Sequence, residues 1–155
     1  MMGGSIVIAC DLPSLLCCDK LYAFGRKVKS VVIKESSENY LEAMLMLREE
    51  KGYIRSIDVA EKLGVTKPSV SYATKRLREN GYITMDPDGL IALTPSGLEI
   101  AERMFIRHKF LTEFFIRLGV SEMTAREDAC KIEHAISAES FDAICRLVKE
   151  TETQK

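Results

Sequence analysis

The sequence contains only two histidines, and its five cysteines include no CxxC pair. Without CxxC spacing a zinc ribbon is not indicated, and an odd, irregularly spaced set of cysteines does not predict a disulfide framework. Such a chain is expected in a reducing cytoplasm. No nucleophile–base arrangement and no phosphate-binding loop is visible, so we expect a protein that is not an enzyme. The cysteines are Cys10, Cys17, Cys18, Cys130 and Cys145.

Long apolar runs and an excess of charge are missing as well. No stretch approaches the roughly 18 to 20 apolar residues that a membrane-spanning helix needs, so no membrane association is expected. The formal net charge is −1, which provides no bulk attraction to nucleic acid or to an anionic membrane. What is present is a chain of 155 residues, 46% of them hydrophobic. This suits one domain, or a small domain with an appendage, around a real core.

Residues 1–33 differ in character from the rest of the chain. Their apolar stretches are interrupted by Asp11, Pro13 and Asp19. Neither a basic segment nor a small-residue cleavage pattern identifies a secretory signal. We expect a poorly ordered extension, to which we assign no function. Lipidation or redox chemistry at the adjacent pair Cys17-Cys18 is the alternative.

A helix–turn–helix pattern follows this extension. A first helix, capped by Ser36 or Ser37, has its apolar residues at helical spacing and ends at Gly52. A short helix over residues 56–63, a tight turn that contains glycine, and a second helix over residues 67–79 come next. This order of elements is typical of a helix-turn-helix motif, in which the second helix enters the major groove of DNA.

A hairpin pattern stands directly after the second helix. Residues 82–85 and 90–93 are short apolar segments that flank the turn sequence Asp86-Pro87-Asp88-Gly89, and they are predicted to be strands. A hairpin in this place is a wing. Residues 34–97 are therefore predicted to form a winged helix-turn-helix DNA-binding domain in a mainly α protein.

The second helix of the motif carries an excess of positive charge. Between Tyr53 and Asn80 there are six basic and three acidic residues, and four of the basic ones lie on this helix. Hydroxyl groups and lysines near the start of such a helix suit phosphate contacts and base edges. A merely solvated helix face is the alternative interpretation. The predicted DNA-facing residues are Thr66, Lys67, Ser69, Ser71, Tyr72, Lys75 and Arg76.

Residues 98–155 are predicted to be all-helical and to form a dimerisation module. A long helix is expected from near Leu98 to Gly119, and its apolar residues cover more than one stripe of its surface. A helix of this kind must be buried on more than one side, so a second subunit is expected to cover it. Two-fold symmetry in a homodimer then presents two recognition helices to a palindromic operator in double-stranded DNA.

Polar side chains that can bind metal lie in this module. Residues 128–137 are predicted to form one helix, on which Cys130, Glu133 and His134 stand at i, i+3 and i+4 and share a face. A thiolate, a carboxylate and an imidazole there form a plausible half of a divalent metal site. The alternative is a buried cysteine beside a surface pair. By itself His108, which stands between two basic residues, fits a surface position.

Four stretches of the chain, taken together, carry a family resemblance. They are SENYLEAMLMLREEKGY, DVAEKLGVTKPSVSYATKRLRENGYI, LTPSGLEIAERMFIRHKFL and DACKIEHAIS. They resemble the iron- and manganese-dependent repressors of the diphtheria toxin repressor and manganese transport regulator family, over about residues 36–148. The resemblance implies a metal-dependent transcriptional regulator, a repressor of iron or manganese uptake genes, in which metal binding fixes the DNA-competent dimer.

In that family the metal ligands come from the first helix, from a histidine on the long helix, and from a CxxEH or ExxEH cluster. Manganese-type members carry Asp where Asn39 stands and Glu where Cys130 stands, while iron-type members have Met in place of Asn39. Thiolate ligands favour Fe²⁺ or Zn²⁺ and oxygen ligands favour Mn²⁺, so the choice between Mn²⁺ and Fe²⁺ stays open. The ligands that the resemblance implies are Asn39, Glu42, His108, Cys130, Glu133 and His134.

Two alternative functions stay open at this point. A winged-helix regulator without metal control would use Cys130 as a thiol sensor. A zinc hydrolase would use Glu133 as its general base, although such an enzyme normally needs three protein ligands and an open coordination position in a substrate cleft. Nothing in the sequence indicates a cleft of that kind.

Overall fold

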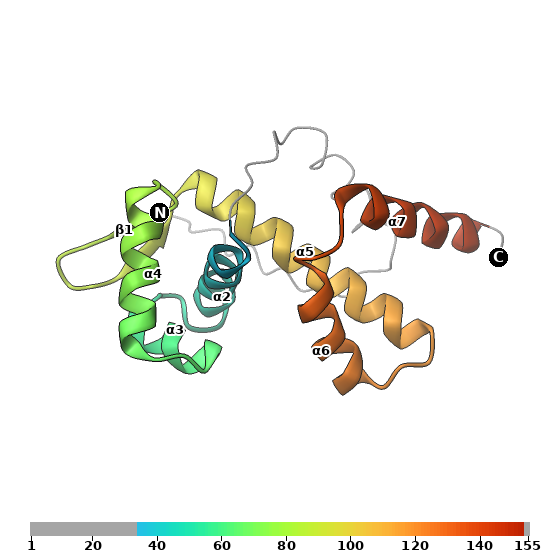
Figure 1. Ribbon diagram of the computed structural model, residues 1–155, viewed down its shortest axis with the longest axis horizontal. Helices are drawn as coiled ribbons and strands as arrows, with labels where there is room; N and C mark the ends of the chain where they lie inside the picture. The colour runs from blue at the N-terminus through green and yellow to red at the C-terminus, as the bar shows by residue number, and fades with distance from the viewer. Residues whose placement is uncertain (1–33, 154–155) are drawn as a thin grey trace, which may run out of the picture. The chain divides into compact units, whose positions relative to one another are not determined.

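The computed structural model describes residues 34–153 of the chain (Figure 1). The chain divides into two compact units, of which one contains residues 30–135 and the other includes residues 136–155. All the candidate functional residues belong to the first unit. The extension predicted for residues 1–33 lies outside the described residues.

Helix α2 (Glu35–Lys51) opens the first unit and ends at Gly52, whose φ of 78° lies in the left-handed region. Glycine adopts this conformation without the Cβ clash that other residues meet, so it is a natural helix terminator. The predicted serine cap is wrong, because the helix begins after Lys34 and no side chain caps it. The buried face of α2 includes one carboxylate, Glu42, among apolar residues.

The helix-turn-helix consists of α3 (Ser56–Leu63) and α4 (Lys67–Glu79). Gly64 ends α3 with a φ of 63°, and the chain turns at once into α4. The Thr66 hydroxyl caps α4 by accepting a hydrogen bond from the backbone N–H of Ser69, at 3.4 Å. This cap satisfies one of the N–H groups that every helix start leaves without a partner.

The inner face of α4 is apolar except at one position. Val70 and Leu77 are buried, the third buried residue is Thr74, and Ala73 is half-buried. The Thr74 hydroxyl donates a hydrogen bond to the Val70 carbonyl at 2.9 Å. A hydroxyl that is satisfied within its own helix costs little to bury, which makes threonine acceptable in this core.

The wing is a two-stranded antiparallel hairpin of β1 (Ile83–Met85) and β2 (Ile91–Leu93). The Ile91 N–H donates a hydrogen bond to the Ile54 carbonyl at 2.9 Å, which attaches the wing to the segment before α3. The predicted winged helix-turn-helix is confirmed. Its core includes Leu41, Met44, Val59, Val70, Leu77, Ile83, Ile91 and Ile100.

The long helix α5 (Pro95–Arg117) starts earlier than the predicted Leu98. The Thr94 hydroxyl accepts a hydrogen bond from the Gly97 N–H at 3.2 Å, and proline is well tolerated in a first helical turn. At Gly97 an added Cβ would lie 1.9 Å from the carbonyl oxygen of Tyr82. Only glycine permits this close approach, so the residues just before Leu98 form the capped first turn of α5 and lie against the start of the wing.

Helix α6 (Glu122–Ile132) packs against α5, and so does α2 (Figure 1). The single helix predicted over residues 128–137 is wrong, because α6 ends at Ile132 and a turn follows. The Ala135 N–H bonds to the Ile132 carbonyl at 2.9 Å, a tighter pattern than that of an α-helix. The turn directs Glu133 and His134 back toward α2 and α5, where their contacts lie.

The second unit contains helix α7 (Ala138–Thr153), which agrees with the all-helical character predicted for residues 98–155. The described part of the protein is thus helical apart from its small wing, and the mainly α fold class is confirmed. No helix among residues 34–153 combines the length and the apolar character that crossing a bilayer requires.

Candidate metal centre and DNA-binding surface

Three side chains from three different elements meet beside the middle of α5. Glu42 comes from α2, His108 from α5 and Glu133 from the turn after α6, and their potential ligand atoms all lie within 4.8 Å of one another. Glu42 is 7% exposed and Glu133 is fully buried. Carboxylates are almost never buried without a partner that offsets their loss of hydration. This three-residue cluster therefore needs positive charge close by.

The turn that carries Glu133 is held in place from α5. His108 Nδ1 lies 2.8 Å from Glu133 Oε2, and Arg107 Nη1 donates to the Glu133 backbone carbonyl at 3.2 Å. The other carboxylate oxygen, Oε1, is buried without a hydrogen bond, and His134 Nε2 lies 3.3 Å from it. A buried carboxylate oxygen without a well-aligned donor is a rare and costly arrangement, so it points to a ligand.

His134 lies next to the cluster, with its side chain only 1% exposed. Its Nε2 atom is 2.7 Å from Asn39 Oδ1, and its Nδ1 atom is 3.0 Å from Glu38 Oε2. The predicted ligands Asn39 and His134 are thus brought to the edge of the cluster, where they contact each other and His134 also approaches Glu133. Glu38 was missed in the sequence, although its position four residues before Glu42 puts both carboxylates on one helix face.

Cys130 stands apart from the other predicted ligands. It is exposed, on the last turn of α6, and does not belong to the group within 4.8 Å. Partial burial of the thiol and the negative charges of Glu133 and Glu42 raise the pKa of Cys130 above its ordinary value. The charges of the carboxylates therefore affect the thiol, but its sulfur does not converge with their oxygens. Because α6 ends before residue 133, the shared helix face predicted for Cys130, Glu133 and His134 does not form.

The two buried carboxylates of the cluster, Glu42 and Glu133, repel each other and lack enough nearby positive charge to offset that repulsion. Burial, followed by repulsion from Glu133, raises the pKa of Glu42 to about 7. Burial also opposes ionisation of Glu133, but the hydrogen bond from His108 and the nearby His134 ring outweigh it and lower the pKa of that carboxyl. For His134, burial is likewise opposed by its close contacts with the carboxylates of Glu133 and Glu38, and its pKa rises to about 9. The cluster thus recruits protons to balance its carboxylates.

A divalent cation fits this arrangement. Two carboxylates and an imidazole, with an amide oxygen at their edge, are the oxygen and nitrogen ligands that Mn²⁺ and Fe²⁺ accept. Such an ion would give the unpartnered Oε1 of Glu133 a partner and replace the protons that offset repulsion between the two carboxylates. The side chains that could hold it are Glu42, His108 and Glu133, with Asn39 and His134 beside them.

The predicted DNA-facing residues all lie exposed on α4 or at its N-terminal cap. The Thr66 and Ser69 hydroxyls contact each other at 2.8 Å, and the guanidinium of Arg76 donates to the Tyr72 hydroxyl at 3.1 Å. Tyr72 keeps 64% of its surface exposed. The helix therefore presents a row of hydroxyl groups and cations on one outward face.

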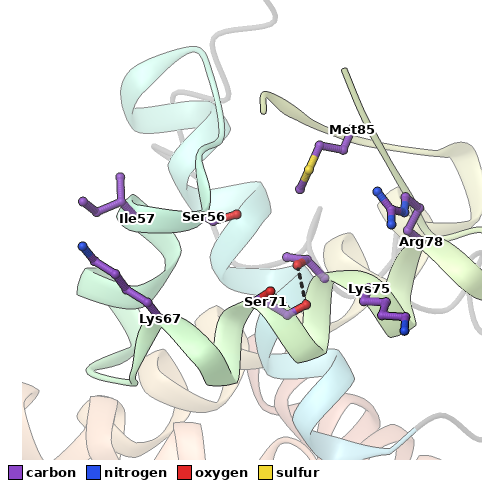
Figure 2. A pocket seen from close by; sticks show the side chains of 8 residues that line it. Ser56, Ile57, Lys67, Ser71, Lys75, Arg78 and Met85 are labelled. Carbon is purple, nitrogen blue, oxygen red and sulfur yellow. Dashed lines mark hydrogen bonds between the residues drawn. The ribbon is translucent and has the colours of Figure 1, made fainter. Parts of the chain in front are cut away.

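Beside this row, an open groove of about 530 Å³ runs between α3, α4 and β1 (Figure 2). Lys67, Lys75 and Arg78 supply three cations around it, while Ile57 and Met85 make part of its wall apolar. Arg78 was missed in the sequence, although it follows Lys75 at i+3 and so shares its helix face. No sequence signal marks Ile57 or Met85 as groove residues. The full lining is Ser56, Ile57, Lys67, Ser71, Thr74, Lys75, Arg78 and Met85.

Two family models match the chain. Residues 33–90 match the N-terminal DNA binding domain of iron dependent repressors, and residues 94–155 match the metal binding and dimerisation domain of iron dependent repressors. Only strand β2 of the wing lies between the two matches.

Curated relatives and a solved structure agree with these matches. The transcriptional regulator MntR of Salmonella typhimurium is 36% identical over 125 residues, which cover 81% of this chain and 80% of that protein. The HTH-type transcriptional regulator MntR of Bacillus pumilus is 39% identical over 114 residues, or 74% of this chain and 79% of that protein. The crystal structure of IdeR from T. acidophilum aligns with a TM-score of 0.65 at 26% identity, over 79% of this chain and 56% of that one.

Proposed function

This chain belongs to the iron-dependent repressor family, and we propose that metal binding by Glu42, His108 and Glu133 controls how it binds DNA. The protein is a metal-dependent transcriptional regulator with a DNA-binding domain followed by a metal-binding and dimerisation domain, and it is not an enzyme. Its cofactor is Mn²⁺ or Fe²⁺. The role of the family is repression of metal uptake.

One observation carries the proposal: the three side chains of the cluster come from both sequence domains. Glu42 belongs to the helix that packs behind the helix-turn-helix, whereas His108 and Glu133 belong to the segment matched by the metal-binding domain. A cation supplies the positive charge that joins these carboxylates. A cation that binds one arrangement of α2, α5 and α6 better than the others shifts the population toward that arrangement, typically by about 1–3 kcal/mol.

The remaining predicted ligands differ in how close they lie to the metal cluster. Asn39 and His134 contact each other and lie at the edge of the cluster, so we include both in the ligand set. Cys130 is exposed and outside the group, and we assign it a weaker influence on the choice of metal. Its raised pKa keeps the thiol protonated, which makes it a poor nucleophile. This argues against the alternative in which Cys130 acts as a thiol sensor.

On the DNA side, α4 is the recognition helix. Thr66, Lys67, Ser69, Ser71 and Tyr72 occupy its cap and first turns, where hydroxyls and cations reach phosphates and base edges. Farther along the helix, Arg78 adds a cation beside the groove. The later predicted contacts are Lys75 and Arg76.

A homodimer would present two copies of α4 to a palindromic operator, since two-fold symmetry in the protein is matched by symmetry in the site. Ile116, Leu118 and Met123 expose apolar surface where α5 passes into α6, which suits contact with a second subunit. The relatives are bacterial transcriptional regulators, which supports the cytoplasm as the location. Residues 34–97 and 98–155 remain the proposed domains, with the boundary inside the first turn of α5.

Metal-dependent DNA binding tests this function. Mn²⁺, Fe²⁺ and Zn²⁺ are titrated anaerobically while binding to a palindromic upstream fragment is measured by fluorescence anisotropy. Mn²⁺ or Fe²⁺ should tighten binding, and Glu133→Gln should abolish the response. Glu49→Gln, an equal charge change on an exposed residue of α2, is the matched control and should respond normally. DNA affinity that ignores every metal would contradict the proposal.

A further inference from the structure

Glu38 stands between two basic side chains from different elements. Its Oε2 atom is 3.0 Å from His134 Nδ1, and its Oε1 atom accepts a hydrogen bond from Arg103 Nη2 at 3.1 Å. The side chain is 13% exposed, and that of Arg103 is 19% exposed. Each carboxylate oxygen therefore has one basic partner, and the carboxylate links α2 to α5 and to the turn after α6.

The contact with Glu38 determines which edge of the His134 ring faces the cluster. Because Nδ1 is directed at Glu38, Nε2 is directed at Asn39 Oδ1 and Glu133 Oε1, at 2.7 and 3.3 Å. In metal sites, a ligating histidine almost always donates its other ring N–H to a carboxylate, carbonyl or water, which fixes the tautomer and orientation of the ring. Glu38 occupies that position here.

We propose that Glu38 is a positioning residue, which holds the His134 ring so that its Nε2 atom serves the metal centre. This rests on the proposed function, because it takes the cluster of Glu42, His108 and Glu133 as the metal site. Arg103 helps to fix the orientation of the Glu38 carboxylate, because it donates a hydrogen bond to the second oxygen. Without that ion pair, the Glu38 carboxylate would be free to rotate away from the ring.

Glu38 acts through His134 and is not a ligand itself. Both of its oxygens are already engaged, and it lies outside the group of ligand atoms within 4.8 Å. A residue of this kind tunes affinity and geometry while the ligands themselves stay in place.

A double-mutant cycle tests the proposal, with Co²⁺ as the probe because its visible bands report coordination. Glu38→Gln keeps the size of the side chain but loses its charge, and it should weaken Co²⁺ binding about 10- to 100-fold, the range typical of outer carboxylates. In a His134→Ala background the same change should cost nothing further, because Glu38 acts through that ring. His134→Gln serves as a second background that better preserves side-chain volume.

Glu49→Gln is the matched control, an equal charge change on an exposed part of the same helix, and it should leave Co²⁺ affinity unchanged. The Co²⁺ bands of Glu38→Gln at saturation should show the wild-type coordination number, because no ligand is lost. Equal losses in the wild-type and His134→Ala backgrounds would overturn the proposal, since Glu38 would then act independently of His134. A changed coordination number at saturation would overturn it too, as it would make Glu38 a ligand.

The failure of this inference differs from failure of the proposed function. If Glu133→Gln binds Co²⁺ like the wild type, the metal site itself is wrong. If Glu133→Gln loses binding while Glu38→Gln behaves like Glu49→Gln, the site stands and only the role of Glu38 falls. Far-UV circular dichroism and thermal melting of the metal-free variants separate either result from misfolding.

Discussion

The outward face of α4 and the cluster beside α5 are both polar, yet they are built in opposite ways. Every predicted DNA-facing residue lies on one helix or at its cap and points into solvent. The metal cluster is drawn from three elements, and two of its members, Glu42 and Glu133, are buried carboxylates. Exposed charges are screened and contribute little individually, whereas buried charges are costly when left unpaired. A single change should therefore matter far more in the cluster.

The largest effect is expected for Glu133→Gln. This change removes the carboxylate that contacts His108 and His134, and with it the fully buried negative charge of the cluster. Affinity for Mn²⁺ should fall more than about 100-fold, since even residues outside the ligand shell cost roughly 10- to 100-fold. Isothermal titration calorimetry measures the change. If Glu133→Gln kept the wild-type Mn²⁺ affinity, single changes would not matter more in the metal cluster than on the α4 surface.

Proton release should give the next largest effect. In the metal-free protein the pKa of Glu42 is about 7 and that of His134 is about 9, so at pH 7 Glu42 is partly protonated and His134 is charged. Metal ligands must be deprotonated, so binding expels these protons and affinity rises with pH. The rise should be about tenfold per pH unit for each proton released.

Titrations between pH 6 and pH 8, in buffers of different ionisation enthalpy, count the protons released on metal binding. The DNA-binding surface of α4 serves as the comparison, because protonation of the metal cluster does not change the charges on that surface. DNA binding at fixed, saturating metal should therefore vary much less over the same pH range. A metal affinity that does not change with pH would show that Glu42 and His134 are not the groups displaced.

Single cations of the DNA-binding surface should have smaller effects. Lys75→Ala and Arg78→Ala each remove one exposed charge beside the groove and should weaken DNA binding several-fold. The slope of log affinity against log salt concentration should become shallower by about 1, the amount expected for one lost phosphate contact. Lys131→Ala, an exposed lysine on α6, is the control and should leave the salt slope unchanged.

The smallest effect is expected for Cys130→Ser. The thiol is exposed and outside the group of converging ligand atoms, so Mn²⁺ affinity should stay at the wild-type level. Zn²⁺ affinity should fall slightly if the thiol joins the site once a softer metal is bound, because thiolate favours such metals. Competition with a chromophoric chelator measures both. A large loss of Mn²⁺ affinity would place Cys130 among the ligands.

Elements whose signals are local could be read from the sequence. The turn at Gly64 and the hairpin sequence depend on neighbouring residues, and each was found where the pattern indicated it. The errors came at helix ends. Thr94, Pro95 and Gly97 look like a break, but they form the capped first turn of α5, because threonine caps, proline tolerates the first turn and glycine admits the backbone of Tyr82.

The sequence by itself determined the winged helix-turn-helix fold and the types of residue at each site. These are a row of hydroxyls and cations on α4, and a set of carboxylate, imidazole and amide groups that the family resemblance assigns to metal. The tertiary structure alone decided which of those groups converge. It ended α6 at Ile132 and so turned Glu133 inward and left Cys130 exposed. It also placed Glu38 against His134, across 96 positions of the chain. Periodicity along one helix carries no information about another, so contacts of this kind appear only when the helices pack.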